Sequence, residues 1–162
     1  MELSTELRRA LDELEIRNLI ARIPVLNDTR QEREDYIACF AEDAVWECVL
    51  REGEVTPGAH LSSRLVGREA ILADRARIRE RRIQGPGINS FHFNSNLVVC
   101  FDSAEQATAE SYWLFLRGDD EHEWRVSSVG YYHDRLIRTT DGWKLRHRRF
   151  SMGKPAGGHF DA

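Results

Sequence analysis

The sequence lacks the short motifs by which many cofactor-dependent enzymes and hydrolases are recognised. It contains no GxGxxG, no Walker A pattern and no GxSxG nucleophile elbow, and it has no CxxC, HExxH or HxxxH spacing. These absences disfavour nucleotide-binding enzymes, serine hydrolases of the usual kind and zinc proteins. We therefore expect no cofactor and no metal, although a metal site assembled from scattered His and Asp residues stays open.

Long apolar runs, an excess of basic residues and an even set of cysteines are also missing. No apolar run approaches the roughly 18–20 residues that span a membrane, and the chain opens on a charged, helix-like segment rather than a signal peptide. The net charge of −4 argues against a general nucleic-acid binder. Cys39, Cys48 and Cys100 sit among apolar neighbours and are expected to be reduced, buried thiols. We expect a soluble cytoplasmic protein without a nucleic-acid or membrane partner.

What the chain does contain is enough residues for one domain with a sizeable core. With 162 residues, of which 31 % are charged, a single domain over residues 1–162 is expected. No internal repeat, low-complexity segment or linker divides it. Residues 153–162 carry Gly, Pro, His159 and Phe160, so we expect a tail that is either flexible or folded over a pocket.

Three segments have helical periodicity. Residues 3–23 carry apolar side chains at three- and four-residue steps, and Pro24 is expected to kink or stop this helix. Residues 31–41 predict a second helix, and residues 68–83 predict a third. We expect the core-facing positions to be Leu7, Leu11, Leu14, Ile16, Leu19, Ile20 and Ile23 in the first helix, and Ile71, Leu72, Ile78 and Ile83 in the third.

The third helix also carries a stripe of basic residues. Such a run is most often a solvated helix face, and the alternative is a surface for an anionic partner. We expect the solvated face. The basic residues of this stripe are Arg68, Arg75, Arg77, Arg79, Arg81 and Arg82.

Strand-like runs fill the rest of the chain and end in turn signals such as Asp-Gly. Residues 50–63 predict an exposed loop, a hairpin or a lid. Helices followed by long antiparallel strands predict an α+β fold in which a curved sheet leaves a conical pocket. The expected strands are residues 44–49, 91–99, 106–117, 124–139 and 143–152.

Residues 91–99 are the best candidate for a polar wall of that pocket. A period of two places His92, Asn94 and Asn96 on one face of a strand and apolar side chains on the other. The alternative is a partly exposed strand start with a surface histidine. Asp28 follows four mostly apolar residues, and a curved sheet would bring it towards His92. Its alternative role is a cap for the next helix.

Several segments, taken in order, resemble the SnoaL-like division of the NTF2-like superfamily. The resemblance spans roughly residues 12–152. It implies a cone-shaped α+β barrel, with three N-terminal helices packed on a curved antiparallel sheet, and a homo-oligomer that is often a trimer. The matching segments are residues 15–20, Asp28, 40–46, 67–71, His92 with Asn96, 130–136 and 141–148.

Within this superfamily the chain is most similar to cofactor-free lyases of the hexachlorocyclohexane dehydrochlorinase, scytalone dehydratase and bile-acid 7α-dehydratase type. The resemblance implies a catalytic dyad of Asp28 and His92. It also implies that Trp46 and Arg148 are pocket residues. A lysine of the dehydrochlorinase pocket is replaced here by Ile23, which leaves the substrate and the leaving group open.

These residues predict general acid–base chemistry. Asp28 is expected to accept the Nδ1 proton of His92, so that Nε2 removes a proton from carbon while Arg148 stabilises a departing anion. The alternative for Arg148 is a surface member of the basic cluster at residues 146–149. The alternative role for the candidate aromatic residues is ordinary core packing. Candidate substrate-binding residues are Trp46, Tyr112, Trp113, Asn96 and Tyr132.

Two functional hypotheses follow. The first is a lyase, a dehydratase or dehydrohalogenase, acting on a small hydrophobic and cyclic molecule, with an isomerase using the same base as its variant. The second is a non-catalytic subunit or ligand-binding protein, because residues 111–117 and 130–136 also resemble the small (β) subunits of aromatic-ring dioxygenases. The joint presence of Asp28 and His92 favours the first.

Overall fold

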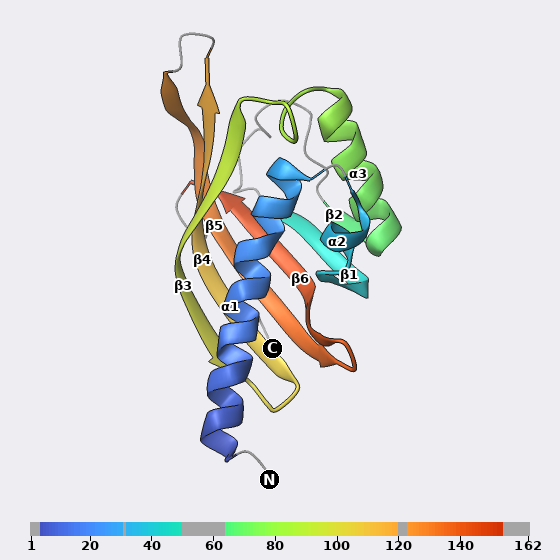
Figure 1. Cartoon of the computed structure of the whole chain (residues 1–162), viewed down its shortest axis with the longest axis vertical. Coiled ribbons are helices and arrows are strands. Elements are labelled where there is room, and N and C mark those ends of the chain that lie inside the picture. Colours follow the sequence, from blue (N-terminus) through green and yellow to red (C-terminus); the bar gives the residue numbers. More distant parts are fainter. Residues whose placement is uncertain (1–3, 31, 50–63, 120–122, 154–162) are drawn as a thin grey trace.

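The computed structural model describes residues 4–30, 32–49, 64–119 and 123–153 (Figure 1). It confirms the predicted α+β fold, in which helices pack on one curved sheet. The predicted loop or lid at residues 50–63 and the predicted tail beyond Gly153 lie outside the described residues. The elements are α1 (Thr5–Thr29), α2 (Glu34–Ile37), β1 (Phe40–Val49), β2 (Arg64–Val66), α3 (Arg68–Glu80), β3 (Ser90–Phe101), β4 (Gln106–Gly118), β5 (Trp124–Thr139) and β6 (Gly142–Met152).

The six strands form a single open sheet in the order β2-β1-β6-β5-β4-β3. Four neighbouring pairs are antiparallel, but β1 and β6 run parallel, so the prediction of a purely antiparallel sheet is wrong in this one pair. A parallel pair needs a long crossover, and here β2, α3 and the β3–β5 meander separate the two strands. The sheet curves around α1 without closing (Figure 1).

Helix α1 begins at Thr5, close to its predicted start at residue 3, and continues beyond its predicted end. The Ser4 hydroxyl caps it by accepting a hydrogen bond from the Leu7 N–H at 3.2 Å. The helix does not stop at Pro24 but runs to Thr29. Proline removes only one backbone donor, and Leu26 and Asn27 beyond it are buried. Their packing holds the last turn, which carries Asp28.

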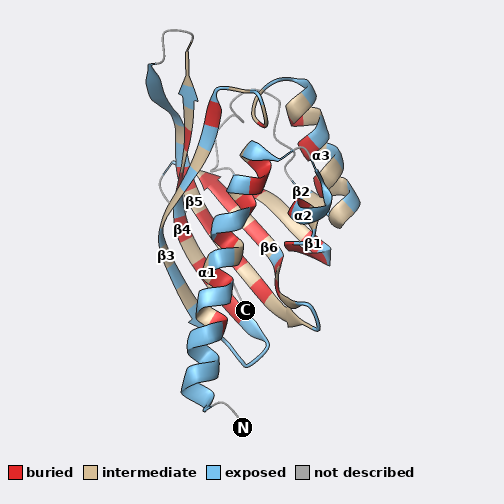
Figure 2. Ribbon diagram, viewed as in Figure 1, coloured by how far each residue is buried: buried red, intermediate tan, exposed pale blue. Residues whose placement is uncertain are grey.

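The two halves of α1 have different surroundings. Ile16, Ile20 and Ile23 are almost completely buried, whereas Leu7 and Leu11 are each about half exposed. Leu14 is also about half exposed, so the prediction that these three leucines face the core is wrong. In Figure 2 only the first turns of the helix extend past the sheet. The three leucines are exposed mainly because they lie on a different face of the helix from the buried Asp12 and Ile16.

The second and third helices are shorter than predicted. α2 spans only Glu34–Ile37, and β1 already begins at Phe40, because Phe40 and Ala44 pack into the core from an extended backbone. α3 ends at Glu80, and Arg82 beyond it adopts a positive φ of 54°. The main core cluster lies where the apolar pattern placed it, between α1 and the concave face of the sheet. No helix among the described residues is long and apolar enough to cross a bilayer.

Strand β3 contains a bulge that reverses its alternation. The pairing with β4 shifts between Ser95 and Val98, and Asn96 has φ 57°. His92 and Asn94 point inward before the bulge, but Asn96 is exposed after it. The prediction that Asn96 shares a face with His92 is therefore wrong, because one extra residue changes the phase of every later side chain.

Candidate functional site

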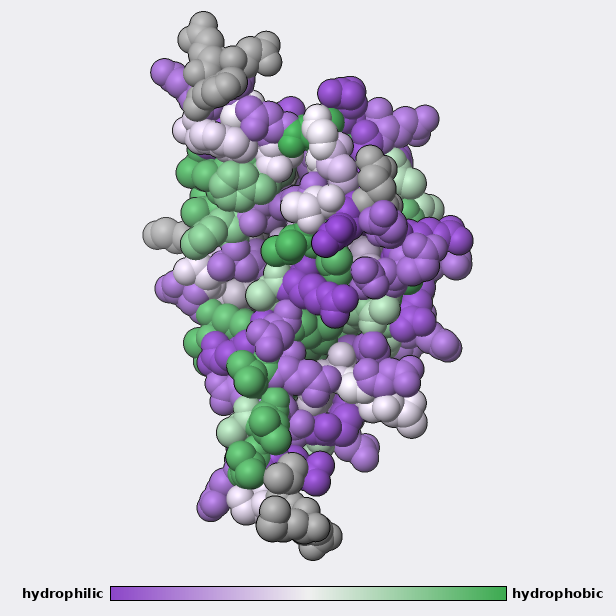
Figure 3. Space-filling view, in the orientation of Figure 1, coloured by the Kyte–Doolittle hydropathy of each residue, from purple (hydrophilic) through white to green (hydrophobic). Residues whose placement is uncertain are grey.

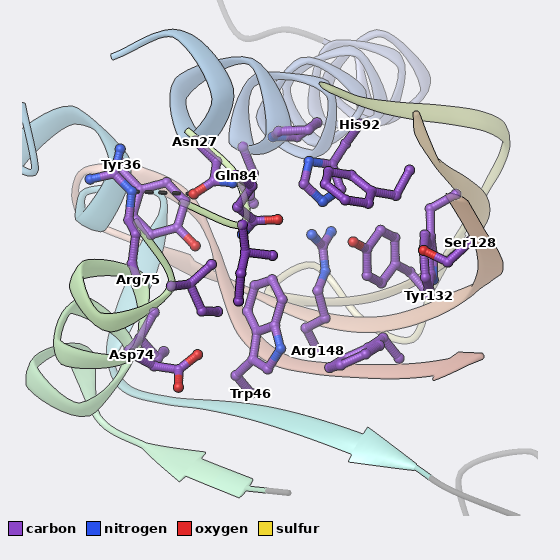
Figure 4. A pocket seen from close by; sticks show the side chains of 18 of the residues that line it. Asn27, Tyr36, Trp46, Asp74, Arg75, Gln84, His92, Ser128, Tyr132 and Arg148 are labelled. Carbon is purple, nitrogen blue, oxygen red and sulfur yellow. Dashed lines mark hydrogen bonds between the residues drawn. The ribbon is translucent and has the colours of Figure 1, made fainter. Parts of the chain in front are cut away.

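A cavity of about 300 Å³ opens between the end of α1, α3 and the concave face of the sheet (Figure 4). Its wall is mainly apolar and aromatic, with a few polar groups directed inward, which is the usual composition of a small-molecule site. The sequence predicted such a pocket but not its full lining. The apolar wall includes Ile23, Trp46, Ile71, Trp113, Phe115 and Phe150.

Asp28 and His92 meet at the edge of this cavity. One carboxylate oxygen, Oδ1, lies 2.9 Å from His92 Nδ1, and the other, Oδ2, accepts the His92 backbone N–H at 2.7 Å. The side chains are only 7 % and 15 % exposed, respectively. Asp28 thus holds both the strand and the ring, and it does not cap α2, whose N-cap residue is Arg33 with no side-chain cap bond.

The hydrogen bond at Nδ1 decides which ring nitrogen is available. Because a carboxylate can only accept, His92 donates from Nδ1 in its neutral form and keeps Nε2 as an acceptor. The ring lines the cavity and packs against Phe115, with 4.7 Å between ring centroids. The geometry therefore provides a base with a fixed tautomer next to an apolar space.

Arg148 lies inside the molecule. The alternative interpretation, a surface position in the basic cluster at residues 146–149, is therefore wrong. Arg148 forms two bonds with Asp134, Nε to Oδ1 at 2.8 Å and Nη2 to Oδ2 at 2.6 Å, and both side chains are 1 % exposed. Its guanidinium lies 4.0 Å from the ring centroid of Tyr132 and 5.5 Å from that of Trp46. Burial alone lowers the pKa of Arg148, but Asp134 overcomes this and raises it, so the group stays charged.

The guanidinium of Arg148 also faces the cavity. Asp134 occupies Nε and Nη2, so within the described part of the chain Nη1 remains for a ligand. Figure 4 shows the guanidinium directed towards His92 and Tyr132. Sequence reasoning missed Asp134, because only the register of β5 against β6 places it opposite Arg148.

The predicted binding residues divide into two groups. Trp46, Trp113 and Tyr132 line the cavity, whereas Tyr112 and Asn96 do not. Tyr112 is 48 % exposed on the convex face, where its ring packs against Tyr131. Alternation along β4 forces this choice, since neighbours in a strand point to opposite faces.

Trp113 can lie flat over the sheet because its partner in β5 is a glycine. Gly130 stands opposite Trp113 in the register of the two strands. A Cβ at Gly130 would lie 2.5 Å from the indole ring and would also clash with the Ser151 carbonyl oxygen. Any larger residue would therefore displace this part of the cavity wall.

Tyr36 is a cavity residue that the sequence did not single out. It belongs to α2, is 4 % exposed and directs its hydroxyl into the cavity (Figure 4). Burial raises the pKa of Tyr36 above its usual value, and it raises the pKa of Tyr132 to about 12. Both phenols are therefore protonated at neutral pH and can donate a hydrogen bond to a ligand. Among the described residues, no group of three or more His, Cys, Asp or Glu side chains could hold a metal ion.

Solved structures share this fold over nearly the whole chain. An NTF2-like protein with a cystatin-like fold from Novosphingobium aromaticivorans has a TM-score of 0.75 at 24 % identity, covering 97 % of this chain and 90 % of its own. Hexachlorocyclohexane dehydrochlorinase LinA-type3 from Novosphingobium barchaimii LL02 has a TM-score of 0.70 at 20 % identity, covering 98 % and 99 %. A Catenulispora acidiphila protein in complex with S-DNPA has a TM-score of 0.67 at 24 % identity, covering 88 % and 94 %.

At these identities the structural similarity establishes the fold and not the activity. No curated protein matches the chain. The model of the SnoaL-like domain, however, matches residues 8–149, which is most of the sequence. The chain therefore belongs to the SnoaL-like domain family.

Proposed function

We propose that this protein is a cofactor-free lyase, a dehydratase or dehydrohalogenase, that acts on a small hydrophobic, cyclic molecule. The observation that carries the proposal is the Asp28–His92 pair, whose ring lines an apolar cavity while its carboxylate is nearly buried. The relationship of the fold to a hexachlorocyclohexane dehydrochlorinase supports the same class of chemistry.

The reaction is an elimination. His92 Nε2 takes a proton from a substrate carbon, and the electron pair of that C–H bond forms a double bond to the neighbouring carbon. The leaving group departs from the neighbouring carbon with its bonding pair, as an anion or, once protonated, as a neutral molecule. Asp28 stabilises the imidazolium formed in this step and keeps the ring in place.

Arg148 and the aromatic residues supply the other roles. Arg148 presents a permanent positive charge in a cavity of low polarity, where it stabilises the departing anion more strongly than it would in water. Trp46 and Trp113 provide flat apolar surfaces for a ring. Tyr132 carries a protonated hydroxyl that can assist the departure of an oxygen leaving group.

The test is proton exchange and elimination measured on a panel of cyclic alcohols, ketones and halides in deuterated solvent. We expect wild type to exchange or eliminate on at least one class, and His92→Ala and Asp28→Asn to lose this activity while remaining folded by circular dichroism. Full activity in either variant would refute the dyad. Exchange that yields a rearranged product without loss of a leaving group would favour the isomerase.

We also propose a homotrimer. The convex face of the sheet exposes large apolar side chains that adjoin one another across β3, β4 and β5, and Figure 3 shows apolar side chains along that edge. A patch of this kind marks an interaction surface. Light scattering of the purified protein tests the proposal, with three copies expected. A monomer would favour a β-subunit role beside a large partner. The exposed apolar residues of this convex patch are Phe91, Phe93, Tyr112, Trp124, Val126 and Val129.

A cytoplasmic location is part of the proposal. All three cysteines lie within the described residues and none forms a disulfide. Cys39 and Cys48 are buried, but the prediction of a buried thiol is wrong for Cys100, which faces outward in β3 after the bulge. Reduced thiols are typical of the cytoplasm. Cell fractionation tests this, and recovery of the protein in an oxidising compartment would contradict it.

A further inference from the structure

The end of α1 that carries Asp28 is an unfavourable place for a carboxylate. The C-terminus of a helix has partial negative charge and unpaired carbonyl groups. The last turn of α1 contains no basic residue of its own. Locally, the Arg30 backbone N–H pairs with the Leu26 carbonyl at 3.2 Å and the Thr29 hydroxyl pairs with the Val25 carbonyl at 2.7 Å. The other carbonyl groups and the negative end of the helix are left for side chains from elsewhere in the molecule.

Two arginines of α3 reach that end. Arg75 Nη2 donates to the carbonyl oxygens of Leu26 at 3.1 Å and Arg30 at 3.0 Å. Arg79 Nη2 donates to the carbonyl oxygens of Asn27 at 2.7 Å and Arg30 at 2.6 Å. The guanidinium groups thus hold the carbonyls on both sides of Asp28 and place positive charge where the helix is negative.

A side-chain path continues from Arg75 to the histidine. Arg75 Nε donates to Asn27 Oδ1 at 3.3 Å, as Figure 4 shows, and Asn27 Nδ2 lies 3.4 Å from Asp28 Oδ1. Asp28 then binds the ring and the backbone of His92. Arg75 is 6 % exposed and Asn27 is 7 % exposed, so water competes little with these bonds.

This arrangement corrects part of the prediction that the arginines of residues 68–83 form a solvated face. Arg81 and Arg82 are exposed as predicted, but Arg75 and Arg79 are not. Arg75 is buried, and its guanidinium lies 4.3 Å from the ring centroid of Tyr36. Arg79 is half-buried. No carboxylate accepts from Arg75 in the described part of the chain, where its partners are carbonyl and amide oxygens. A charge buried in this way, without an acidic partner, calls for an explanation beyond packing.

We propose that Arg75 is a positioning residue for the Asp28–His92 pair: it fixes the last turn of α1 and, through Asn27, the carboxylate that orients the ring. The catalytic consequence rests on the lyase proposed above, but the geometric claim does not. The groups that interact with Asp28 include His92 from β3, Arg79 from α3, Asn27 from α1 and Tyr132 from β5. Arg75 acts on it through Asn27 and the backbone.

The first test needs no substrate. NMR is used to follow exchange of the His92 backbone N–H with solvent and the chemical shift of its Nδ1 proton, with central amides of β4 as an internal reference for global stability. Arg75→Met should speed His92 exchange about 10-fold relative to that reference and move the Nδ1–H signal upfield. Arg75→Lys, which keeps the charge but not the planar fork, should give a smaller change.

Two further variants make the result interpretable. Arg81→Met changes an exposed arginine at the end of the same helix, and it should leave both signals unchanged. If Arg75→Met does not fold, Arg79→Met removes the bonds to the Asn27 and Arg30 carbonyls from a half-buried position, and it should change His92 in the same direction. Unaltered His92 signals in a folded Arg75 or Arg79 variant with lower global stability would overturn the proposal and leave a purely structural role.

The second test applies once a turnover assay exists. Arg75 lines the cavity, but its guanidinium donates to oxygens of Leu26, Asn27 and Arg30. Arg75→Met should therefore lower kcat about 10-fold with KM within about 2-fold of wild type, because the base is displaced while the aromatic wall and Arg148 remain. A raised KM with unchanged kcat and unchanged His92 signals would mean that Arg75 binds substrate directly, which also overturns positioning. If wild type lacks lyase activity, the function proposed above fails, while the NMR result still decides whether Arg75 positions His92.

Discussion

Two histidine–carboxylate pairs lie on opposite faces of the same sheet, and they differ mainly in their surroundings. On the concave face, Asp28 and His92 are 2.9 Å apart and the carboxylate is 7 % exposed. On the convex face, Glu110 Oε1 lies 3.2 Å from His133 Nδ1, and the Glu110 side chain is 42 % exposed. The pairing itself is therefore common to both faces.

What distinguishes the inner pair is the cavity beside it. His92 lines an apolar space that also contains the charged guanidinium of Arg148, whereas His133 does not line that cavity. The inner carboxylate is fixed by two bonds to one residue, through Oδ1 and Oδ2. Fixed geometry and an adjacent apolar cavity, more than the two residue types, therefore distinguish the inner pair and make it the candidate base of the proposed lyase.

The largest expected effect is on the lyase activity proposed for the inner pair. His92→Ala should lower kcat/KM on any accepted substrate by about 10²–10⁴-fold, because it removes a positioned general base. The matched change His133→Ala on the convex face should alter it less than about 2-fold. Steady-state kinetics of the two variants measure the contrast directly. Equal losses of kcat/KM in both variants would show that the cavity does not give the inner pair a distinct function.

The next effect concerns the buried ion pair behind the site. Asp134→Ala leaves Arg148 charged in the interior, and we expect it to lower the free energy of unfolding by about 3–5 kcal/mol. Asp119→Ala removes a partner of Arg125, whose side chain is 71 % exposed, and should cost less than about 1 kcal/mol. Urea denaturation of both variants gives the two values. Similar losses would mean that burial does not set the strength of these pairs.

A smaller effect is expected at the bulge that separates the two phases of β3. Asn96→Val should lower Tm by about 2–4 °C, because a β-branched residue does not tolerate φ near 57°. Asn96→Gly should be close to wild type in Tm. Both variants should keep wild-type KM, since Asn96 lies outside the cavity. A raised KM would restore Asn96 as a binding residue.

The smallest effect is a pH dependence from the convex face. Burial lowers the pKa of His147 below 6.5, although its contact with Glu47 opposes this. The unfolded chain therefore binds the proton first as the pH falls, so the stability contributed by neutral His147 is complete above about 6.5 and is lost below it.

His147→Gln should accordingly reduce the fall in Tm between pH 7.5 and 5.5 by about 1–2 °C. Differential scanning fluorimetry across that range measures the change. The variant and wild type should have parallel Tm curves above pH 7.5, where the histidine is neutral in both states. A steeper fall in the variant would mean that protonation of His147 stabilises the folded state, contrary to the expected sign.

Part of this molecule could be predicted from local pattern alone. The apolar periodicity located α1 and α3, alternation and turn residues located the strands, and the segment order identified the family. Each of these depends on residues close together in the chain. For that reason the sequence by itself determined the fold class and selected Asp28 and His92 as candidates.

Only the tertiary structure decided which candidates share a space. The bulge at Asn96 moved that residue out of the cavity, and the register of β5 and β6 paired Asp134 with Arg148. Arg75 became part of the site because α3 packs beside the end of α1. Such outcomes depend on long-range packing and on one-residue shifts of phase, which composition and periodicity along the chain do not encode.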